Sequence, residues 1–393
     1  MSKVHVIGVG MTNFTKPGDP DAPDYHKQAA DAMRAALADA EVSYDDMQEV
    51  HAGYVYGDSC CGMRAAYEVG QTGVPIFNYN SNCSTGSTAL FGARRAIESG
   101  SVDVAIVVGF EKMAKGALAT YFPDRTMPGS LHGKAMFKKQ GFDPKVPGAA
   151  QMFGGAGVEH QEKYGTTAET FAKIQVKARQ HAQHNPKALF SSALTVEEIL
   201  ASPAQFGPLT RLQCCPPTCG AAAAVLCSEE YAKKIGKADA VKILAQHMET
   251  DSPDSFAGTM YGVVGYGMTQ RAVKSVYETA GFGAQDMDVI ELHDCFTANE
   301  LITYEALGLT EEGCAEKFIN DGDNTYGGKF VVNPSGGLLS KGHPLGATGL
   351  AQCYELVNQL RGNADKRQVE DAKLALQHNI GIGGSVVVTM YGK

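Results

Sequence analysis

The order of apolar segments along the chain constrains its fold more than any other feature. In the first part, short runs rich in Val, Ile and Ala alternate with stretches whose apolar side chains recur at helical spacing. Uniformly apolar short runs are typical of strands buried on both faces, with helices covering the sheet. We predict strands at Val4–Gly10, Val50–Tyr56, Pro75–Tyr79 and Val102–Gly109, and helices at Tyr25–Ala40 and Ser84–Ser99. The pattern indicates an α/β protein.

The same alternation returns from Ala221 onward. Here we predict strands at Ala221–Cys227, Val241–His247, Val289–His293, Phe330–Val332, Lys373–Gln377 and Ser385–Met390, and helices at Thr269–Ala280 and Ala347–Leu360. The second half therefore repeats the order of strands and helices in the first, although no sequence identity between the halves is visible. This order predicts a duplicated β/α unit.

A different kind of segment separates the two regions of alternation. Between Met113 and Pro208 no buried strand is recognisable, and the segment is too long for a structureless loop, so we predict an inserted, partly helical subdomain. Residues 112–187 hold twelve Lys and Arg but five Asp and Glu, a net charge of +7 inside a chain of −9. The excess indicates either an ordinary solvated helical surface or a landing area for an anionic small ligand.

Composition excludes several classes of protein. A net charge of −9 argues against a general nucleic-acid binder, and no apolar run approaches the roughly 20 residues of a membrane span. The N-terminus lacks the features of a secretory signal, and ten cysteines are too few in 393 residues for a disulfide scaffold, so we expect reduced thiols. The C-terminal Tyr391–Lys393 is not the peroxisomal address, which favours a cytoplasmic location, with the peroxisome as the alternative.

The first candidate for chemistry is Cys83, in the run Asn-Ser-Asn-Cys-Ser-Thr-Gly-Ser that starts at Asn80. The run follows a predicted strand and precedes a predicted helix, and its Ser and Asn residues are competent N-caps. A thiol at a helix N-terminus is expected to have a lowered pKa and to be a stronger nucleophile. An inert buried cysteine beside a capped helix is the alternative.

The second candidate is His343, in the run Lys-Gly-His-Pro-Leu-Gly-Ala-Thr-Gly that starts at Lys341. A histidine held by a rigid turn before a helix can act as a base toward a thiol, and the surrounding glycines allow other backbone segments to approach. A structural histidine satisfied by the turn is the alternative.

The third candidate is Glu291–Phe296, at the end of a predicted strand, where His293 and Cys295 come together with carboxylates. Ends of strands in α/β sheets are common sites. A metal site is disfavoured, because adjacent residues of an extended segment point apart and no paired cysteine spacing accompanies them. The run Cys214–Cys219 is an equally poor zinc motif, and we predict no metal.

The fourth candidate is the glycine-rich run His378–Gly384 between two predicted strands. Such a turn exposes backbone N–H groups that can hold an oxyanion. It is followed by a strand instead of a helix, so it is not a dinucleotide-binding loop. A plain tight turn is the alternative.

Taken together, these four motifs resemble those of the thiolases, closest to the subgroup that forms the thiolase part of sterol carrier protein X. The resemblance covers essentially the whole chain. It implies a thiolase fold, with two duplicated β/α halves in a five-layered α-β-α-β-α core and an inserted loop domain that binds coenzyme A (CoA). The implied division is residues 1–112 with 209–235 for the N-terminal half, 113–208 for the loop domain, and 236–393 for the C-terminal half. Thiolases are dimers or dimers of dimers, so we expect a homodimer.

The resemblance also implies a role for each candidate residue. Cys83 would be the nucleophile that becomes acylated, and His343 would activate it and contribute to an oxyanion hole. His293 stands where ordinary thiolases have an Asn. Cys295 matches the cysteine that serves as acid and base in the sterol carrier protein subgroup. The N–H groups of Cys83 and Gly381 would form the second oxyanion hole.

In ordinary thiolases the acid/base cysteine lies near the C-terminal glycine turn, where this chain has Asn379. The implied activity is that of a 3-oxoacyl-CoA thiolase in fatty-acid, branched-chain or sterol side-chain β-oxidation. It would use acyl-CoA and CoA as substrates and hold no permanent cofactor; the residues that bind CoA stay unknown. Two alternatives remain open: a non-catalytic acyl-CoA or lipid carrier, and a thiolase-like retro-aldolase acting on steroid side-chain CoA esters.

Overall fold

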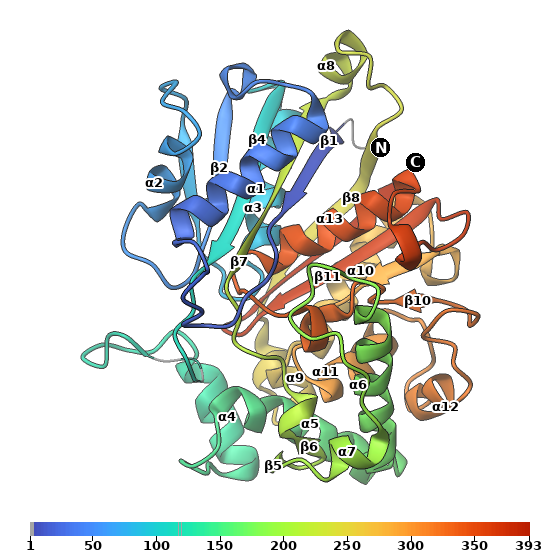
Figure 1. Ribbon diagram of the computed structural model, residues 1–393. Coiled ribbons are helices and arrows are strands. Elements are labelled where there is room, and N and C mark those ends of the chain that lie inside the picture. Colours follow the sequence, from blue (N-terminus) through green and yellow to red (C-terminus); the bar gives the residue numbers. More distant parts are fainter. Residues whose placement is uncertain (1–3, 117, 119) are drawn as a thin grey trace.

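A ten-stranded sheet forms the centre of the protein in a computed structural model that describes residues 4–116, 118 and 120–393 (Figure 1). Its strands run in the order β10-β9-β11-β12-β8-β1-β7-β4-β2-β3. The bounds are β1 Val4–Met11, β2 Glu49–Gly53, β3 Ile76–Tyr79, β4 Val104–Glu111, β7 Gly220–Ser228, β8 Val241–Thr250, β9 Val289–Glu291, β10 Val331–Val332, β11 Leu374–Gly381 and β12 Ser385–Gly392. A separate small sheet pairs β5 (Ala204–Phe206) with β6 (Leu209–Thr210).

The large sheet consists of two five-stranded halves with the same topology. The N-terminal half has the order β3-β2-β4-β7-β1 and the C-terminal half the equivalent order β10-β9-β11-β12-β8. The first two pairings of each half are parallel and the last two are antiparallel. The halves join through a short antiparallel ladder between β1 and β8, from Val4–Ile243 to Val6–Val241. The predicted duplication is therefore confirmed in the strand order.

Helices lie between the two halves and on both outer faces, which gives the five-layered core. The inner layer is α3 and α13, which pack against strands of both halves; α1 and α2 cover the N-terminal half, and α10 and α11 the C-terminal half. The bounds are α1 Tyr25–Ala40, α2 Cys61–Tyr67, α3 Thr85–Glu98, α8 Glu229–Lys234, α9 Met260–Val263, α10 Tyr266–Ala280, α11 Thr297–Ala306, α12 Ala315–Asn320 and α13 Thr348–Arg361. None of the helices within the described ranges has the length and apolar character needed to cross a bilayer.

The first turns of α3 and α13 touch each other, and this contact brings the two halves together at the site. A Cβ atom at Gly349 would lie 2.2 Å from Ser87 Oγ, and one at Gly86 would lie 2.8 Å from the Gly346 carbonyl oxygen. Only glycine leaves room for so close an approach. The segments that precede α3 and α13, which carry Cys83 and His343, are consequently neighbours.

The region between β4 and β7 forms four helices that lie against the C-terminal half (Figure 1). They are α4 Ser130–Gln140, α5 Gly148–Tyr164, α6 Ala168–Ala182 and α7 Val196–Leu200. Helices α5 and α6 pack on α11, where the buried ammonium group of Lys177 pairs with the buried carboxylate of Glu300 and also donates to Tyr304. The division of the chain at residues 113 and 208 stays a prediction.

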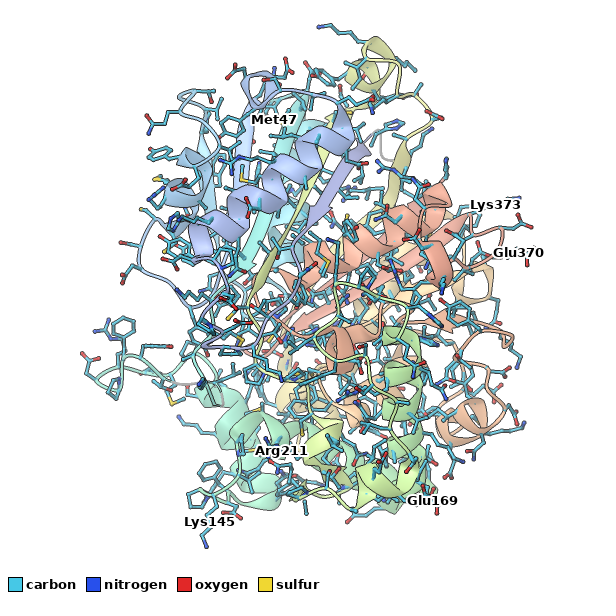
Figure 2. All side chains as sticks on the ribbon, in the orientation of Figure 1. Met47, Lys145, Glu169, Arg211, Glu370 and Lys373 are labelled. Atoms are coloured by element: carbon cyan, nitrogen blue, oxygen red, sulfur yellow. The ribbon has the colours of Figure 1, made fainter. Side chains whose placement is uncertain are left out.

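Part of the positive charge of this region is compensated by acidic groups. Lys163 pairs with Glu312 at 2.7 Å and Lys112 with Asp24 at 2.8 Å, both outside the region. Lys177 is buried, as described above. Exposed lysines remain on α4 and beyond it, including Lys145 at the outer tip of the region (Figure 2). The +7 of the sequence thus overstates the charge that is free to meet a ligand.

Among the strand boundaries that differ from the prediction, two affect the site. Strand β11 continues through Gly381, so His378–Gly381 is paired with β12 and only residues 382–384 form the turn. The expectation of a long glycine turn was wrong, because antiparallel pairing satisfies this stretch of backbone. Strand β9 ends at Glu291, which leaves His293 in an irregular segment.

Candidate active site

Cys83 lies between β3 and α3, in a loop held by its neighbour Asn82. Asn82 adopts a left-handed conformation (φ 52°), and its side-chain amide donates to the Ile382 carbonyl oxygen at 2.7 Å. The helix begins at Thr85 after an N-cap at Ser84, so Cys83 precedes the N-cap instead of lying in the first turn. Cys83 is buried, with 4% of its surface exposed.

The expected low pKa of Cys83 is wrong for the resting protein. Burial raises the pKa of the thiol to about 12, and the nearby Glu111 carboxylate acts in the same direction, while backbone N–H groups of Ile382 and of Cys83 itself partly oppose them. Desolvation disfavours the thiolate more than the helix dipole and these donors favour it. Cys83 is therefore a neutral thiol at neutral pH.

His343 is fixed from two sides in the turn before α13. Its backbone N–H donates to Thr218 Oγ1 at 3.0 Å, and its Nδ1 lies 2.7 Å from Thr348 Oγ1. The Thr348 hydroxyl donates to the Pro344 carbonyl oxygen at 3.0 Å, so it accepts from Nδ1–H of the histidine. Nε2 of His343 is buried and has no partner among the described residues. Burial lowers the pKa of His343 to about 3, so the imidazole is neutral with a free lone pair on Nε2.

His293 follows β9 and is buried beside His343. The two rings meet edge to face with their centroids 5.0 Å apart. Asn379 Nδ2 lies 3.0 Å from His293 Nδ1 and also donates to the Cys83 carbonyl oxygen at 3.1 Å. Burial, with the neighbouring His343 and His378, lowers the pKa of His293 well below its ordinary value.

The structure brings Cys83, His293 and His343 together. One sulfur or nitrogen atom from each lies within 4.8 Å of those of the other two, and all three residues are buried. A sulfur and two imidazole nitrogens are also a donor set for a transition metal. However, a neutral histidine binds a metal through its one unprotonated nitrogen. In His293 that nitrogen is Nδ1, which already accepts a hydrogen bond from Asn379, so the three residues fit a metal poorly.

Cys295 lies outside this group of three but in the same buried region. It precedes α11, and its carbonyl oxygen accepts from the Cys215 N–H at 2.9 Å. Burial raises the pKa of Cys295 well above its ordinary value, with smaller contributions from the thiols of Cys215 and Cys83. Cys83, Cys215 and Cys295 are thus close enough to influence one another electrostatically.

The predicted oxyanion donor Gly381 occupies a different place from the one expected. It lies in β11, where a Cβ atom would come within 2.2 Å of the Ser81 carbonyl oxygen. The backbone N–H that faces the Cys83 sulfur from this side belongs to Ile382, the next residue. A glycine is required at 381 so that the Cys83 loop can pack against the strand, and the candidate donor moves to Ile382.

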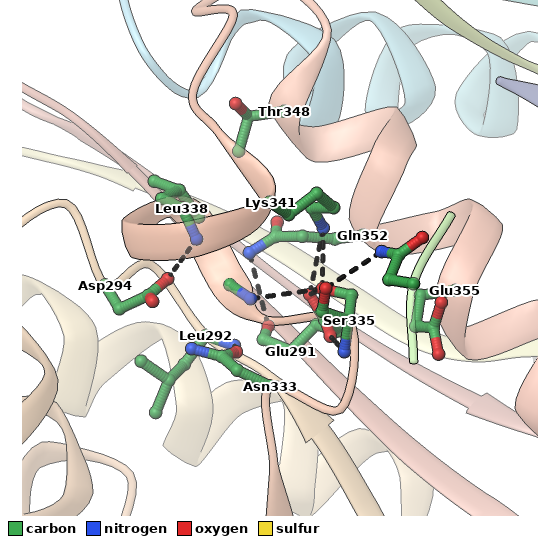
Figure 3. A network of polar contacts seen from close by, with 12 residues as sticks. Glu291, Leu292, Asp294, Asn333, Ser335, Leu338, Lys341, Thr348, Gln352 and Glu355 are labelled. Atoms are coloured by element: carbon green, nitrogen blue, oxygen red, sulfur yellow. Dashed lines mark hydrogen bonds and ion pairs between the residues drawn. The ribbon is translucent and has the colours of Figure 1, made fainter. Parts of the chain in front are cut away.

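A buried ion pair ties together the segments that carry the two histidines (Figure 3). Lys341 Nζ lies 3.3 Å from Glu291 Oε2 and 2.8 Å from Ser335 Oγ, and Ser335 donates to the Glu291 carboxylate through N–H and hydroxyl. Glu291 is two residues before His293, and Lys341 two residues before His343. The pair therefore fixes the distance between the two segments that carry the rings.

Asp294 fixes the same two segments a second time. Its buried carboxylate accepts from the N–H groups of Leu338 at 2.7 Å and Leu339 at 3.3 Å, at the start of the π-helix Gly337–Lys341 (Figure 3). A Cβ atom at Gly337 would lie 2.0 Å from this carboxylate, and the residue has φ 60°. Asp294 thus has a structural contact, while His293 faces the cysteine.

Sequence reasoning missed several residues of the site. The run Cys214–Cys219 is a poor zinc motif, yet it passes along the site: Cys215 contacts Cys295, and Pro217 and Thr218 contact His343. Asn379, a departure from the thiolase pattern, contacts both His293 and the Cys83 loop. The spacing of Glu291 and Lys341, each two residues before a histidine, was the one available signal for the ion pair.

A small, partly open pocket lies beside the glycine turn. Residues 380–384 form one wall, α5 contributes Met152 and Phe153, and Val263, Val264 and Met268 form another wall. His132 and Asp251, which are paired at 2.9 Å, also line it. The pocket is therefore mostly apolar and lies next to the residue that faces the Cys83 sulfur.

Comparison with known proteins places this geometry in context. The family model described as "Thiolase, N-terminal domain" matches residues 4–230, and "Thiolase C-terminal domain-like" matches residues 259–392. "Sterol carrier protein 2" of Homo sapiens is 54% identical over 394 residues, covering 100% of this chain and 72% of that protein. "Benzoylsuccinyl-CoA thiolase subunit BbsB" of Thauera aromatica is 35% identical over 389 residues, covering 97% of this chain and 95% of that protein.

One solved structure of similar fold is described as "Ltp2-ChsH2(DUF35) aldolase". It matches with a TM-score of 0.83 and 23% identity, covering 100% of this chain and 98% of that chain. At this identity the likeness concerns the fold alone.

Proposed function

Because the chain belongs to the thiolase family, we propose that it is a 3-oxoacyl-CoA thiolase that works through an acyl-enzyme on Cys83. The observation that carries the proposal is the juxtaposition of the Cys83 thiol with an imidazole, His343, whose Nε2 lone pair is free and buried. A nucleophile beside an oriented base is the arrangement needed for covalent acyl transfer.

In the first half of the reaction, Cys83 attacks the 3-oxo carbon of the substrate while His343 Nε2 accepts the thiol proton. Both groups start neutral, so charge develops only as the sulfur–carbon bond forms. The bond between C2 and C3 then breaks, leaving an acyl thioester on Cys83 and the enolate of acetyl-CoA or propionyl-CoA. Cys295 gives its proton to C2 of this enolate.

In the second half, Cys295 regains a proton from the thiol of an incoming CoA. The CoA sulfur attacks the acyl thioester, the acyl group leaves with CoA, and the Cys83 sulfur recovers its proton from His343. The N–H groups of Cys83 and Ile382 hold the oxyanion at the acyl carbon, and the two histidines hold the enolate oxygen. A preorganised donor of this kind contributes about 3 kcal/mol to lowering the barrier.

The substrate is held by the apolar pocket and by the helices α4–α7. The pocket beside residues 380–384 takes the acyl chain, because it is lined by Met, Phe and Val and includes Ile382, whose N–H faces the Cys83 sulfur. The exposed lysines of the inserted helices meet the phosphates of CoA. The name of the BbsB relative, a thiolase for a CoA ester, supports a CoA thioester as substrate.

Two other activities are compatible with the comparisons. A retro-aldolase is suggested by the similar fold of the Ltp2 aldolase, and a non-catalytic acyl-CoA or lipid carrier by the name of the sterol carrier relative. Retro-aldol chemistry and carriage need no nucleophilic cysteine, whereas this chain keeps Cys83, His343 and Cys295 in one buried region. This set favours the thiolase.

The deciding experiment is acylation. Incubation with a 3-oxoacyl-CoA should place the acyl group on the peptide that contains Cys83, detected by mass spectrometry as a hydroxylamine-sensitive thioester. Cys83→Ala should lose both adduct and thiolysis. Thiolysis by Cys83→Ala would reject the nucleophile, and binding without adduct or turnover in the wild type would favour the carrier. A set of short, long, 2-methyl-branched and sterol side-chain substrates then defines the acyl preference.

We also propose a homodimer. Seven of the eleven exposed large hydrophobic residues in the described ranges lie within residues 118–142. On the edge strand β3, Phe77 is a further exposed residue of this kind. Exposed apolar surface concentrated in this way is typical of an interface. Light scattering coupled to size-exclusion chromatography should give about twice the mass of 41.6 kDa.

A further inference from the structure

A chain of buried hydrogen bonds runs from the last strand to His293. Its members are Tyr391, Gln377, Ser87, Asn379 and His293, each 1% exposed or less. They come from both halves of the molecule, since Ser87 lies on α3, whereas Gln377 and Asn379 lie on β11.

Every bond in this chain has a defined direction. The Tyr391 hydroxyl donates to Gln377 Oε1 at 2.5 Å, which orients the amide so that its Nε2 donates to Ser87 Oγ at 2.9 Å. Ser87 therefore uses its own hydrogen to donate to Asn379 Oδ1, at 2.8 Å. If the Asn379 amide were rotated to exchange its oxygen and nitrogen, its NH₂ group would face the Ser87 hydroxyl hydrogen. The orientation of this amide is therefore determined by the hydrogen bonds that run from Tyr391 through Gln377 to Ser87.

The direction of the last bond decides the tautomer of His293. With Oδ1 turned toward Ser87, Asn379 Nδ2 points its two hydrogens at the Cys83 carbonyl oxygen (3.1 Å) and at His293 Nδ1 (3.0 Å). Nδ1 of His293 must then be the acceptor, and in a neutral ring the proton resides on Nε2. His343 has the opposite tautomer, because the Thr348 hydroxyl accepts from its Nδ1–H.

We propose that Ser87, Gln377 and Asn379 are positioning residues that fix the tautomer of His293, so that the two histidines have opposite tautomers and different roles. They make His293 an Nε2–H donor for a substrate oxygen, while His343 keeps a bare Nε2 and acts as the base. This proposal rests on the proposed function only where it gives the two tautomers a use in catalysis. The states themselves are properties of the free protein and can be measured without turnover.

The tautomers can be read from ¹⁵N NMR of protein labelled at histidine, with His293→Gln and His343→Gln used to assign the two rings. We expect a protonated Nε2 and a bare Nδ1 for His293, and the reverse for His343. A protonated Nδ1 on His293 in the wild type would overturn the proposal.

Substitution of Asn379 tests the consequence for catalysis. In Asn379→Asp the carboxylate can only accept, so His293 must turn its proton to Nδ1 or carry two protons. The doubly protonated ring still donates from Nε2, and that form is lost as pH rises. We expect a new alkaline decline in kcat of about 10²-fold, the usual effect of losing one oxyanion donor, with KM little changed. A pH profile like that of the wild type would contradict the proposal.

Ser87→Ala is the milder test, because it removes the hydrogen bond that orients Asn379 and leaves the amide in place. The expected loss in kcat is about tenfold, with mixed His293 tautomers in the NMR spectrum. Thr88→Val is the matched control on the same helix, since its hydroxyl bonds only to the Ser84 carbonyl oxygen. Equal effects of the two substitutions would mean that Ser87 has a purely structural role, and would refute the proposal that it orients Asn379.

The outcomes also separate this proposal from the proposed function. If the NMR states are as expected but Cys83 never becomes acylated, the hydrogen-bond chain stands and the thiolase assignment falls. If Cys83 becomes acylated but the tautomers differ from those expected, the thiolase assignment stands and the role of the hydrogen-bond chain is rejected.

Discussion

The site around Cys83 and the inserted helices α4–α7 are built in contrasting ways. Beneath the two histidines, buried charged and polar groups bond to one another, with Lys341, Glu291 and Ser335 1% exposed or less. Residues 118 and 120–142 instead hold seven of the eleven large exposed apolar side chains in the described part of the chain, and Lys145, which follows them, is exposed. The difference indicates that the catalytic groups lie where the two duplicated halves meet, whereas the insertion presents an apolar and basic surface to the solvent.

The two regions also differ in their relation to the duplicated halves. Cys83 precedes α3 and His343 precedes α13, and these helices follow equivalent strands, β3 and β10, in the two halves. The nucleophile and the base are therefore supplied by equivalent connections of the two halves. The insertion has no counterpart of similar length in the C-terminal half.

The largest effect is expected from removing the base. His343→Asn should lower kcat for thiolysis by about 10³-fold, since among the described residues it is His343 that places an unpartnered imidazole nitrogen beside Cys83. Steady-state assays with saturating CoA measure the loss, and circular dichroism checks the fold. Wild-type turnover in this variant would mean that another group takes the thiol proton.

The second prediction concerns the ion pair beneath the histidines. Lys341→Met leaves the Glu291 carboxylate buried without its cation, and the free energy of unfolding should fall by about 3–5 kcal/mol. The double variant Glu291→Gln with Lys341→Met should recover much of the stability. As the control, Lys163→Met in the inserted helices should leave the denaturation midpoint unchanged, because its pair with Glu312 is exposed. Equal effects of Lys341→Met and Lys163→Met would erase the contrast between the two regions.

The third prediction uses the raised pKa of Cys83. With this pKa at about 12, the thiolate fraction grows about tenfold for each pH unit through the neutral range. The rate of inactivation by iodoacetamide should therefore rise steadily from pH 6.5 to pH 9 without levelling off. A plateau below pH 8 would indicate an ionised thiolate–imidazolium pair in the resting enzyme.

The smallest effect is expected at the surface of the insertion. Lys145→Glu should raise KM for CoA by about threefold, with kcat unchanged, because an exposed charge contributes little and is screened by salt. Lys373→Glu, on the opposite side of the molecule (Figure 2), is the control. A matching rise in KM for both variants would reflect net charge alone and not a CoA-facing surface.

Local patterns predicted a large part of the molecule. The helix at Tyr25–Ala40 and the strand from Val4 matched the structure closely, because hydrophobic periodicity reports which face of a segment is buried. The duplicated order of elements and the insertion were also visible. Cys83, His343, His293 and Cys295 were recognised because each stands in a distinctive run of neighbours, and the structure places all four in one buried region.

What depends on contacts between distant segments could not be predicted. The helix position of Cys83 suggested a low pKa, but burial removes the thiol from water and the Glu111 carboxylate adds to the effect, so the pKa is raised although the Ile382 N–H opposes the shift. That the N–H of Ile382 faces the Cys83 sulfur follows from the register of β11 with β12, in which Gly381 is the last residue of β11 and is paired with Ser385.

By itself, the amino-acid order determined which segments are strands and helices and which side chains have the chemistry to react, since these depend on neighbours within a few residues. Only the tertiary structure decided how those side chains are protonated and oriented. Ser87 and Asn379 are 292 positions apart, yet the hydrogen bond between them sets the amide that faces His293. Desolvation and hydrogen-bond direction arise when the two halves close on each other, and no local pattern records them.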